Sequence, residues 1–173
     1  FETPVSKSLQ LLPSRIVSMP RSLPGLTKPT HMVVDRGSAD RVQAGQGIIV
    51  GDVIIGKVHK ASSGLSEVIL VTSPDFSLAA KTARTGAIGV VKGSDNGEMV
   101  LENVLLSEDI KKDDVVVSAG DLQVNGVGMP PDLVIGTIIS VDKKPSALFQ
   151  TARIKSLVDL DRLSTVFVVM GIQ

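Results

Sequence analysis

Two segments of this 173-residue chain repeat nearly the same pattern. They read Asp52-Val53-Ile54-Ile55-Gly56-Lys57-Val58 and Asp132-Leu133-Val134-Ile135-Gly136-Thr137-Ile138. Each is an apolar run interrupted by one glycine, as expected of a β-strand that bends or lets another backbone approach. A shorter apolar run precedes each segment. In the second copy alone, a long loop from Ser118 to Pro131 separates that run from the segment. The sequence therefore predicts a duplicated β unit, with a chance match in a Val- and Ile-rich chain as the alternative.

The residue pattern from His31 onward is typical of an all-β protein. Short apolar runs are separated by Gly, Asp, Asn and Ser, and valine and isoleucine supply 38 of the residues. Only Ser156–Leu163 has a helical spacing of leucines. Strands are predicted at 31–35, 47–50, 53–60, 66–72, 76–82, 87–92, 98–102, 114–118, 133–142, 148–155 and 165–170. Closing such strands into barrels would remove their exposed edges.

Residues 1–30 differ from the rest because prolines interrupt every candidate helix or central strand. We expect an extended arm or linker here, with one short edge strand at Arg15–Val17. The predicted fold is all-β, with two small tandem β-barrels and a Pro-rich N-terminal arm. The predicted units are the arm at 1–30, a first barrel at 31–94 and a second barrel at 95–173, and exchange of strands between the barrels is left open.

The residues that carry chemistry do not assemble into a known active site. Ser140 and Lys143 fit the S-x-x-K spacing of penicillin-binding enzymes, but they end a predicted strand, whereas those enzymes place the pair on one helical turn. His31 and His59 have no second ligand at metal spacing, and hydrolase, zincin and nucleotide-binding motifs are missing. We therefore predict no catalytic, cofactor-binding or metal-binding residue, and no enzymatic activity.

Composition also argues against nucleic acid and against a membrane span within the chain. The 18 basic and 18 acidic residues balance, and the only aromatic residues are four phenylalanines. No apolar run reaches the roughly 18 to 20 residues that a transmembrane helix needs. The chain begins at Phe1 and not at Met, so we expect a fragment whose membrane anchor lies upstream.

The order of the glycine turns resembles the family of the rod shape-determining protein MreC. The similarity begins with an apolar strand, a Gly37-Ser38 turn and a Gln43-Ala44-Gly45 turn, and continues through Ile55-Gly56-Lys57-Val58. It extends downstream, in the family's order, through Thr72–Phe76, Arg84–Gly93, Asp114–Gly120, Met129–Ile138 and Val166–Val169. One departure is Asp132, where the family usually has glycine.

The resemblance implies a specific architecture and role. MreC-like proteins have a cytoplasmic tail, one transmembrane helix, a coiled coil and two small β-barrels on the periplasmic side of the cytoplasmic membrane. The family is implied to act as a non-enzymatic scaffold of lateral wall synthesis that controls cell shape. Its implied partners are the elongation-specific penicillin-binding transpeptidase, MreD, RodZ and MreB, with self-association as a homodimer or filament. An extracytoplasmic carbohydrate- or peptidoglycan-binding module is the alternative function.

The residues expected to matter fall into two groups. Partner contact is predicted in a cleft between the barrels and at exposed apolar side chains such as Phe76, Met129 and Phe149, although core positions are the alternative for each. Replacing Met129 by Glu is then expected to weaken partner binding without lowering the melting temperature. Structural turns are predicted at Gly37, Gly45, Gly56, Gly86, Gly93, Gly120 and Gly136.

Overall fold

The structure is a computed structural model that describes residues 9–19, 28–94, 96–122 and 128–172. Its regular elements are strands with two short 3-10 helices, so the predicted all-β class is confirmed. The strands are β1 (Leu9–Ser18), β2 (His31–Val34), β3 (Gly47–Val50), β4 (Val53–Ala61), β5 (Ser66–Leu70), β6 (Ser77–Thr82), β7 (Ile88–Gly93), β8 (Met99–Leu105), β9 (Val115–Ser118), β10 (Asp121–Leu122), β11 (Gly128–Met129), β12 (Val134–Asp142), β13 (Phe149–Lys155) and β14 (Thr165–Ile172). The 3-10 helices are η1 (Ser38–Asp40) and η2 (Leu160–Arg162).

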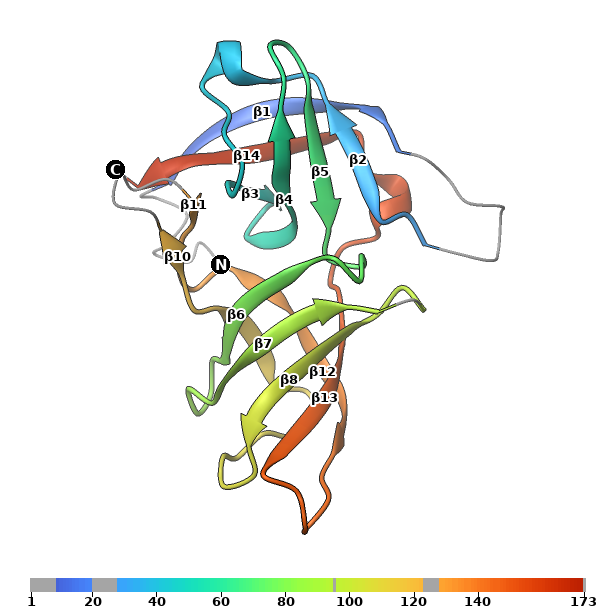
Figure 1. The fold of residues 1–173 in the computed structure, drawn as a ribbon, viewed down its shortest axis with the longest axis vertical. Coiled ribbons are helices and arrows are strands. Elements are labelled where there is room, and N and C mark those ends of the chain that lie inside the picture. The colour runs from blue at the N-terminus through green and yellow to red at the C-terminus, as the bar shows by residue number, and fades with distance from the viewer. Residues whose placement is uncertain (1–8, 20–27, 95, 123–127, 173) are drawn as a thin grey trace.

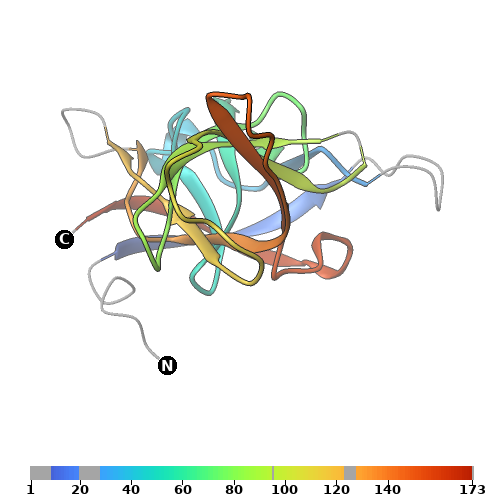
Figure 2. The same ribbon diagram turned by 90° about the horizontal axis from the view of Figure 1, so that it is seen from below.

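Six strands close into a barrel, which forms the lower half of Figure 1. Its hydrogen-bonded order is β6-β7-β8-β13-β12-β9, and β9 pairs with β6 to close the ring. Figure 2 looks along this ring from below. The strands alternate buried and exposed residues, for example along Phe149–Lys155, as expected of strands with one face toward a core.

Six outer strands form the upper half of Figure 1. Their pairing order is β14-β1-β2-β5-β4-β3, and β3 pairs with β14. Each pairing has a counterpart among the barrel strands, with β14 in the place of β6 and β1 to β5 in the places of β7, β8, β9, β12 and β13. The structure shows one closed barrel with these outer strands, and a second barrel is taken up as a proposal below.

The loops before β3 and β9 support the predicted duplication residue by residue. Gly45 and Asp113 both have positive φ, at 93° and 74°. Their backbone N–H groups donate to Val58 O and Ile138 O, both at 2.8 Å. The next residues, Gln46 and Asp114, each accept a hydrogen bond on the side chain from the backbone N–H three positions earlier, at 2.8 and 2.9 Å. The repeat therefore extends beyond the two glycine-containing strands that first indicated it.

Gly56 and Gly136 occupy equivalent places in β4 and β12. Neither has positive φ. A methyl group at Gly56 would collide with Ile69 O of β5, and one at Gly136 would collide with Lys155 O of β13. The ladder register shifts just before each glycine, between Ile54 and Gly56 on β4 and between Val134 and Gly136 on β12. The glycines therefore allow the close backbone approach that a β-bulge requires.

The other predicted glycine turns divide into the same two kinds. Gly45, Gly86 and Gly120 have positive φ, whereas a side chain at Gly37 or Gly93 would collide with a neighbouring backbone carbonyl. Asp132, which stands where the family usually has glycine, has a φ of 67°. This left-handed conformation explains the usual glycine.

The N-terminal region differs from the predicted arm. Leu9–Ser18 forms β1, which pairs with β14 along its length and with β2 at Ile16 and Ser18. Pro13 is tolerated because β2 does not reach it, and its carbonyl instead accepts a hydrogen bond from Arg36 Nε at 3.3 Å. Residues 1–8 and 20–27 of the predicted arm lie outside the described residues.

The predicted domain boundary at residue 94 stays a prediction. Strand pairings join parts of the chain on either side of this residue. β6 and β7 precede it but belong to the closed barrel, and β14 follows it but pairs with β1 and β3. The predicted helical segment at Ser156–Leu163 contains only the three-residue η2. The predicted strands otherwise agree with β2 to β9 and β12 to β14 to within a few residues, while β10 and β11 were not expected.

The clash at the two repeat glycines generates a stability prediction. Gly56→Ala and Gly136→Ala are each expected to lower the free energy of unfolding by about 1–3 kcal/mol, because a methyl group forces the neighbouring strand to move. Urea denaturation of both variants measures this. Gly64→Ala is the matched control, since a methyl group there would meet nothing within 4 Å. Unchanged midpoints for Gly56→Ala and Gly136→Ala would contradict the close-approach role.

A candidate interaction surface at the free end of the barrel

Three loops form the end of the barrel that points away from the outer strands (Figure 1). They are residues 83–87 between β6 and β7, 106–114 between β8 and β9, and 143–148 between β12 and β13. We call this the free end. It combines an ordered polar network with exposed apolar side chains, and both features come from these loops and the strand ends beside them.

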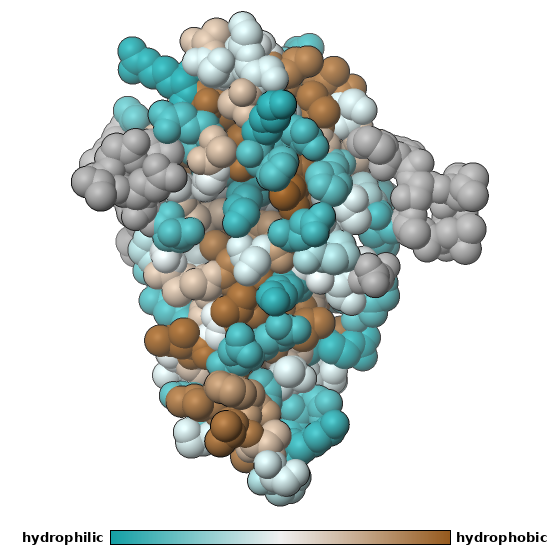
Figure 3. All heavy atoms as spheres, in the orientation of Figure 1, coloured by the Kyte–Doolittle hydropathy of each residue, from teal (hydrophilic) through white to brown (hydrophobic). Residues whose placement is uncertain are grey.

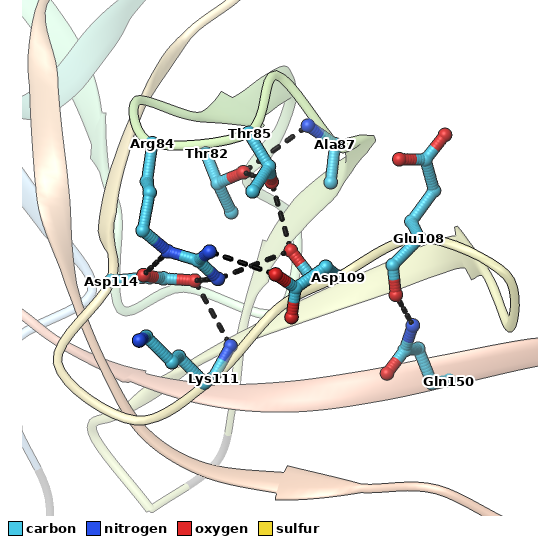
Figure 4. A network of polar contacts seen from close by, with 9 residues as sticks. All are labelled: Thr82, Arg84, Thr85, Ala87, Glu108, Asp109, Lys111, Asp114 and Gln150. Atoms are coloured by element: carbon cyan, nitrogen blue, oxygen red, sulfur yellow. Dashed lines mark hydrogen bonds and ion pairs between the residues drawn. The ribbon is translucent and has the colours of Figure 1, made fainter.

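Arg84 is the centre of the polar network (Figure 4). Its Nε and Nη2 donate to the two carboxylate oxygens of Asp114 at 2.7 and 3.0 Å, and its Nη1 donates to Asp109 Oδ2 at 2.8 Å. Thr85 Oγ1 donates to Asp109 O at 2.8 Å. The 83–87 loop is thereby fastened to the 106–114 loop, and the two-pronged geometry suits a planar guanidinium.

Asp114 is the buried member of this network. Its side chain is 4% exposed, whereas that of Arg84 is 36% exposed. Hydrogen bonding from Arg84 lowers the pKa of Asp114 against the opposing effect of burial, and it also lowers the pKa of Asp109. The same contacts raise the pKa of Arg84. All three groups therefore stay charged at neutral pH.

Gln150 fixes the other side of the 106–114 loop. Its buried side-chain amide donates to Leu105 O at 3.0 Å and to Glu108 O at 2.8 Å. The second of these bonds is drawn in Figure 4. Gln150 is the second residue of β13, next to Phe149, so its amide ties the start of that strand to the end of β8 and to the loop that follows.

Apolar side chains gather on the outer wall of the barrel beside this network. Leu105 is 51% exposed, Leu148 79% and Phe149 45%. Leu105 and Phe149 are direct cross-strand partners, and Leu106 N donates to Leu148 O at 3.0 Å. We name Leu105, Leu148 and Phe149 the tip patch. Hydrophobic atoms are visible at the lower end of the molecule in Figure 3.

The three anchors predicted from the sequence differ in burial. Phe149 is exposed at the free end, whereas Phe76 and Met129 are 0% and 1% exposed. Phe76 and Met129 therefore take the alternative core positions, because Phe76 enters the core just before β6 and Met129 packs where Gly47 leaves room, whereas Phe149 is exposed. Any role of the three in partner binding stays a prediction. Leu105 and Leu148 were missed, although Leu148 adjoins Phe149 in the sequence.

The predicted cleft between the two halves has a counterpart in a cavity of about 680 Å³ at their junction. Its lining includes Asn96 and Lys155 from the barrel side and Thr72 and Asp161 from the other side. An ion pair of 3.5 Å joins Lys28 to Asp161 at its rim. Its lining mixes acidic and basic side chains, among them Glu98, Lys155 and Asp161, whereas the centre of a protein interface is usually depleted of charged residues, so it is a less favourable protein-binding site than the tip patch.

The residues of the enzyme-like motif are separated by secondary structure. Ser140 lies within β12, and Lys143 lies in the exposed loop that follows it. In the part of the chain that the structure describes, no three His, Cys, Asp or Glu side chains are grouped as a metal site. Across those same residues, no helix has the length and apolar character needed to cross a bilayer.

Comparison with known proteins identifies the family. The model of the rod shape-determining protein MreC barrel core matches residues 27–170. The chain belongs to the MreC family. It is 33% identical over 140 residues to the cell shape-determining protein MreC of Listeria monocytogenes, covering 78% of this chain and 46% of that protein. The chain spans less than half the length of the curated relatives it matches.

Solved MreC structures share the fold. The Listeria monocytogenes MreC superimposes with a TM-score of 0.79 and 26% identity, covering 94% of this chain and 76% of that one. The major periplasmic domain of an MreC described as a cell shape-determining filament gives 0.76 with 19% identity, covering 96% and 98%. MreC from a Helicobacter pylori complex with the penicillin-binding protein PBP2 gives 0.70 with 14% identity, covering 93% and 98%. The last two similarities concern the fold alone.

The Arg84 network predicts acid sensitivity. Because the pKa values of Asp109 and Asp114 are lowered on folding, their stabilisation is complete above the unfolded carboxyl pKa of about 4 and is lost as the pH falls through the folded values. Asp114→Asn should lower the free energy of unfolding at pH 7. It should also make the decrease of that free energy below about pH 4 less steep. Chemical denaturation across pH measures this, with exposed Asp142→Asn as control. Parallel pH profiles for Asp114→Asn and the unmodified chain would contradict it.

The burial of Met129 reverses the earlier expectation for its replacement. Met129→Glu should lower the free energy of unfolding by about 2–5 kcal/mol, because it removes buried packing and places a carboxylate in the buried space beside Gly47. Met129→Leu, which keeps the volume, should cost less than about 1.5 kcal/mol. Thermal melting of both variants decides the point. Equal melting temperatures for Met129→Glu and the unmodified chain would show that the side chain leaves its buried position readily.

Proposed function

We propose that this chain is the extracytoplasmic part of a non-enzymatic scaffold of lateral cell-wall synthesis, and that it controls cell shape by binding the elongation-specific penicillin-binding transpeptidase. Membership of the MreC family carries this proposal. The fold it shares with MreC from the Helicobacter pylori complex supports the choice of a penicillin-binding protein as partner. MreD, RodZ and MreB are proposed as further members of the same assembly on the strength of the resemblance.

The proposed form of the scaffold is a pair of tandem barrels. The one-for-one correspondence of strand pairings between the closed barrel and the outer strands supports this. We place the pair on the periplasmic side of the cytoplasmic membrane, held there by an upstream transmembrane helix. The periplasmic assignment of a structural relative supports that location. Self-association as a dimer or filament is part of the same proposal, since that relative is described as a filament.

The features of the free end suit binding better than chemistry. Exposed leucine and phenylalanine supply apolar contact, and the Arg84 and Gln150 hydrogen bonds hold the loops that carry it. A pre-ordered surface loses less conformational entropy on association. The alternative of a sugar-binding module is less well supported, because sugar-binding faces usually use Trp or Tyr and the sequence has neither.

Biolayer interferometry tests the proposal directly. The chain is immobilised and exposed to the extracytoplasmic part of the elongation transpeptidase from the same organism, with the division-specific transpeptidase as control. Selective, saturable binding of the elongation enzyme is expected. Equal binding of both enzymes, or binding of neither by a folded chain, would contradict the proposed partner, and retention on purified peptidoglycan instead would favour the sugar-binding alternative.

A further inference from the structure

We propose that the tip patch is the docking surface for a partner protein that presents an apolar strip bordered by carboxylates. This inference rests on the proposed function and goes beyond it by assigning the surface and the chemistry of the partner. Leu105, Leu148 and Phe149 supply the apolar contact, and Lys143 and Lys144 supply the charge beside it.

Contiguity distinguishes the tip patch from the other exposed apolar residues. Leu11, Val17, Leu65, Ile88 and Leu157 are also exposed, but no cross-strand pair or backbone hydrogen bond joins any two of them. The three residues of the tip patch are joined by a cross-strand pair and a backbone hydrogen bond. Single exposed apolar residues are ordinary on a protein surface, whereas a cluster of them marks a contact site.

Rigidity is the second argument. Gln150 bonds the carbonyls of Leu105 and Glu108, and Arg84 holds the 106–114 loop through Asp109 and Asp114. The backbone beneath the tip patch is thus tied on both sides. An anchor that is already ordered contributes more of its apolar contact to affinity.

Charge defines the partner. Lys143 and Lys144 are exposed, and the described residues offer neither of them an ion-pair partner within 4 Å. Three other basic groups of the barrel are paired, Lys81 with Asp132 at 3.0 Å, Lys92 with Glu102 at 3.6 Å and Arg153 with Glu98 at 2.8 Å, whereas Lys111, Lys112 and Lys155 are exposed and, like the two loop lysines, have no ion pair within 4 Å among the described residues. Asp142 precedes the two lysines and leaves the loop 142–144 with one net positive charge. Carboxylates on the partner complement that charge.

A protein fits this surface better than a lipid membrane does. The charges of the whole chain balance, and the lysines of the free end, Lys111, Lys112, Lys143 and Lys144, are interspersed with acidic side chains such as Asp109 and Asp113, whereas attraction to anionic lipid usually requires a cluster of four or more basic residues. An apolar centre with charged groups at its border is the arrangement of a protein interface. The observations therefore favour a folded protein partner.

The test compares matched variants in the interferometry experiment with the elongation transpeptidase. Leu148→Ser and Phe149→Ser are each expected to weaken binding about ten-fold or more, as truncation of an interface anchor does. Leu65→Ser is the control, because Leu65 precedes β5 as Leu148 precedes β13 and is 46% exposed. It should bind as the unmodified chain does. Leu148→Ser alters a side chain that is 79% exposed, so folding is preserved even if Phe149→Ser proves unstable.

A second arm tests the charge. Lys143→Glu combined with Lys144→Glu should slow association and weaken its dependence on salt, while Lys60→Glu on β4, also exposed, should leave both unchanged.

The outcomes separate the two proposals. Binding that is equal in the unmodified chain and all tip-patch variants would overturn this inference and leave the proposed function standing. An unmodified chain that binds no transpeptidase would overturn both.

Two further measurements use the chain without a partner. Sedimentation with anionic vesicles that depends on Lys143 and Lys144 would reassign the surface to a membrane. A dimer in analytical ultracentrifugation that Leu148→Ser dissolves would reassign it to a second copy of the chain.

Discussion

The pairing of β4 with β12 is the contact on which the arrangement of the two halves depends. Val134 N donates to Asp52 O at 3.0 Å, and Val53 and Val134 are parallel partners. These are the two strands whose sequences repeat. At its start, each of the two strands pairs with one neighbour in its own half, β4 with β3 and β12 with β9. The second neighbour joins later along the strand: β5 pairs with β4 from Gly56 onward, and β13 pairs with β12 from Thr137 onward. The edges left free at Val53 and Val134 therefore meet each other.

The repeat glycines make this junction possible. A bulge before each glycine bends the strand, and the missing side chain lets the backbone of β5 or β13 approach at the point where the free edge ends. Apolar residues of both strands, including Ile54 and Ile135, are completely buried in one continuous core. The loop after β9 adds a second link, because Met129 of β11 fills the space above Gly47 of β3. The two halves are thus joined by backbone pairing and by side-chain packing.

The free end is stabilised independently of that junction. Its loops are held by Arg84, Asp114 and Gln150, which connect loop to loop and loop to strand within the closed barrel. At the equivalent place among the outer strands, Gln46 stands where Asp114 does and makes the same local hydrogen bond without a charge. The two copies therefore share a backbone design, and only the barrel copy uses the position for an ion pair. This difference suits a barrel end that is free of further packing and carries the tip patch.

The positions of the strands, the repeated unit and the MreC family were accessible from the sequence, because they depend on local alternation, on turn residues and on the order of glycines along the chain. Membership of each strand in one half or the other was decided by tertiary structure. β14 joins β1 and β3 across nearly the whole length of the chain, and no local pattern encodes a hydrogen-bond partner that distant. Exposure was decided in the same way. Phe76, Met129 and Phe149 are alike as apolar residues, and only packing buries the first two and leaves Phe149 beside Leu105 and Leu148 at the surface.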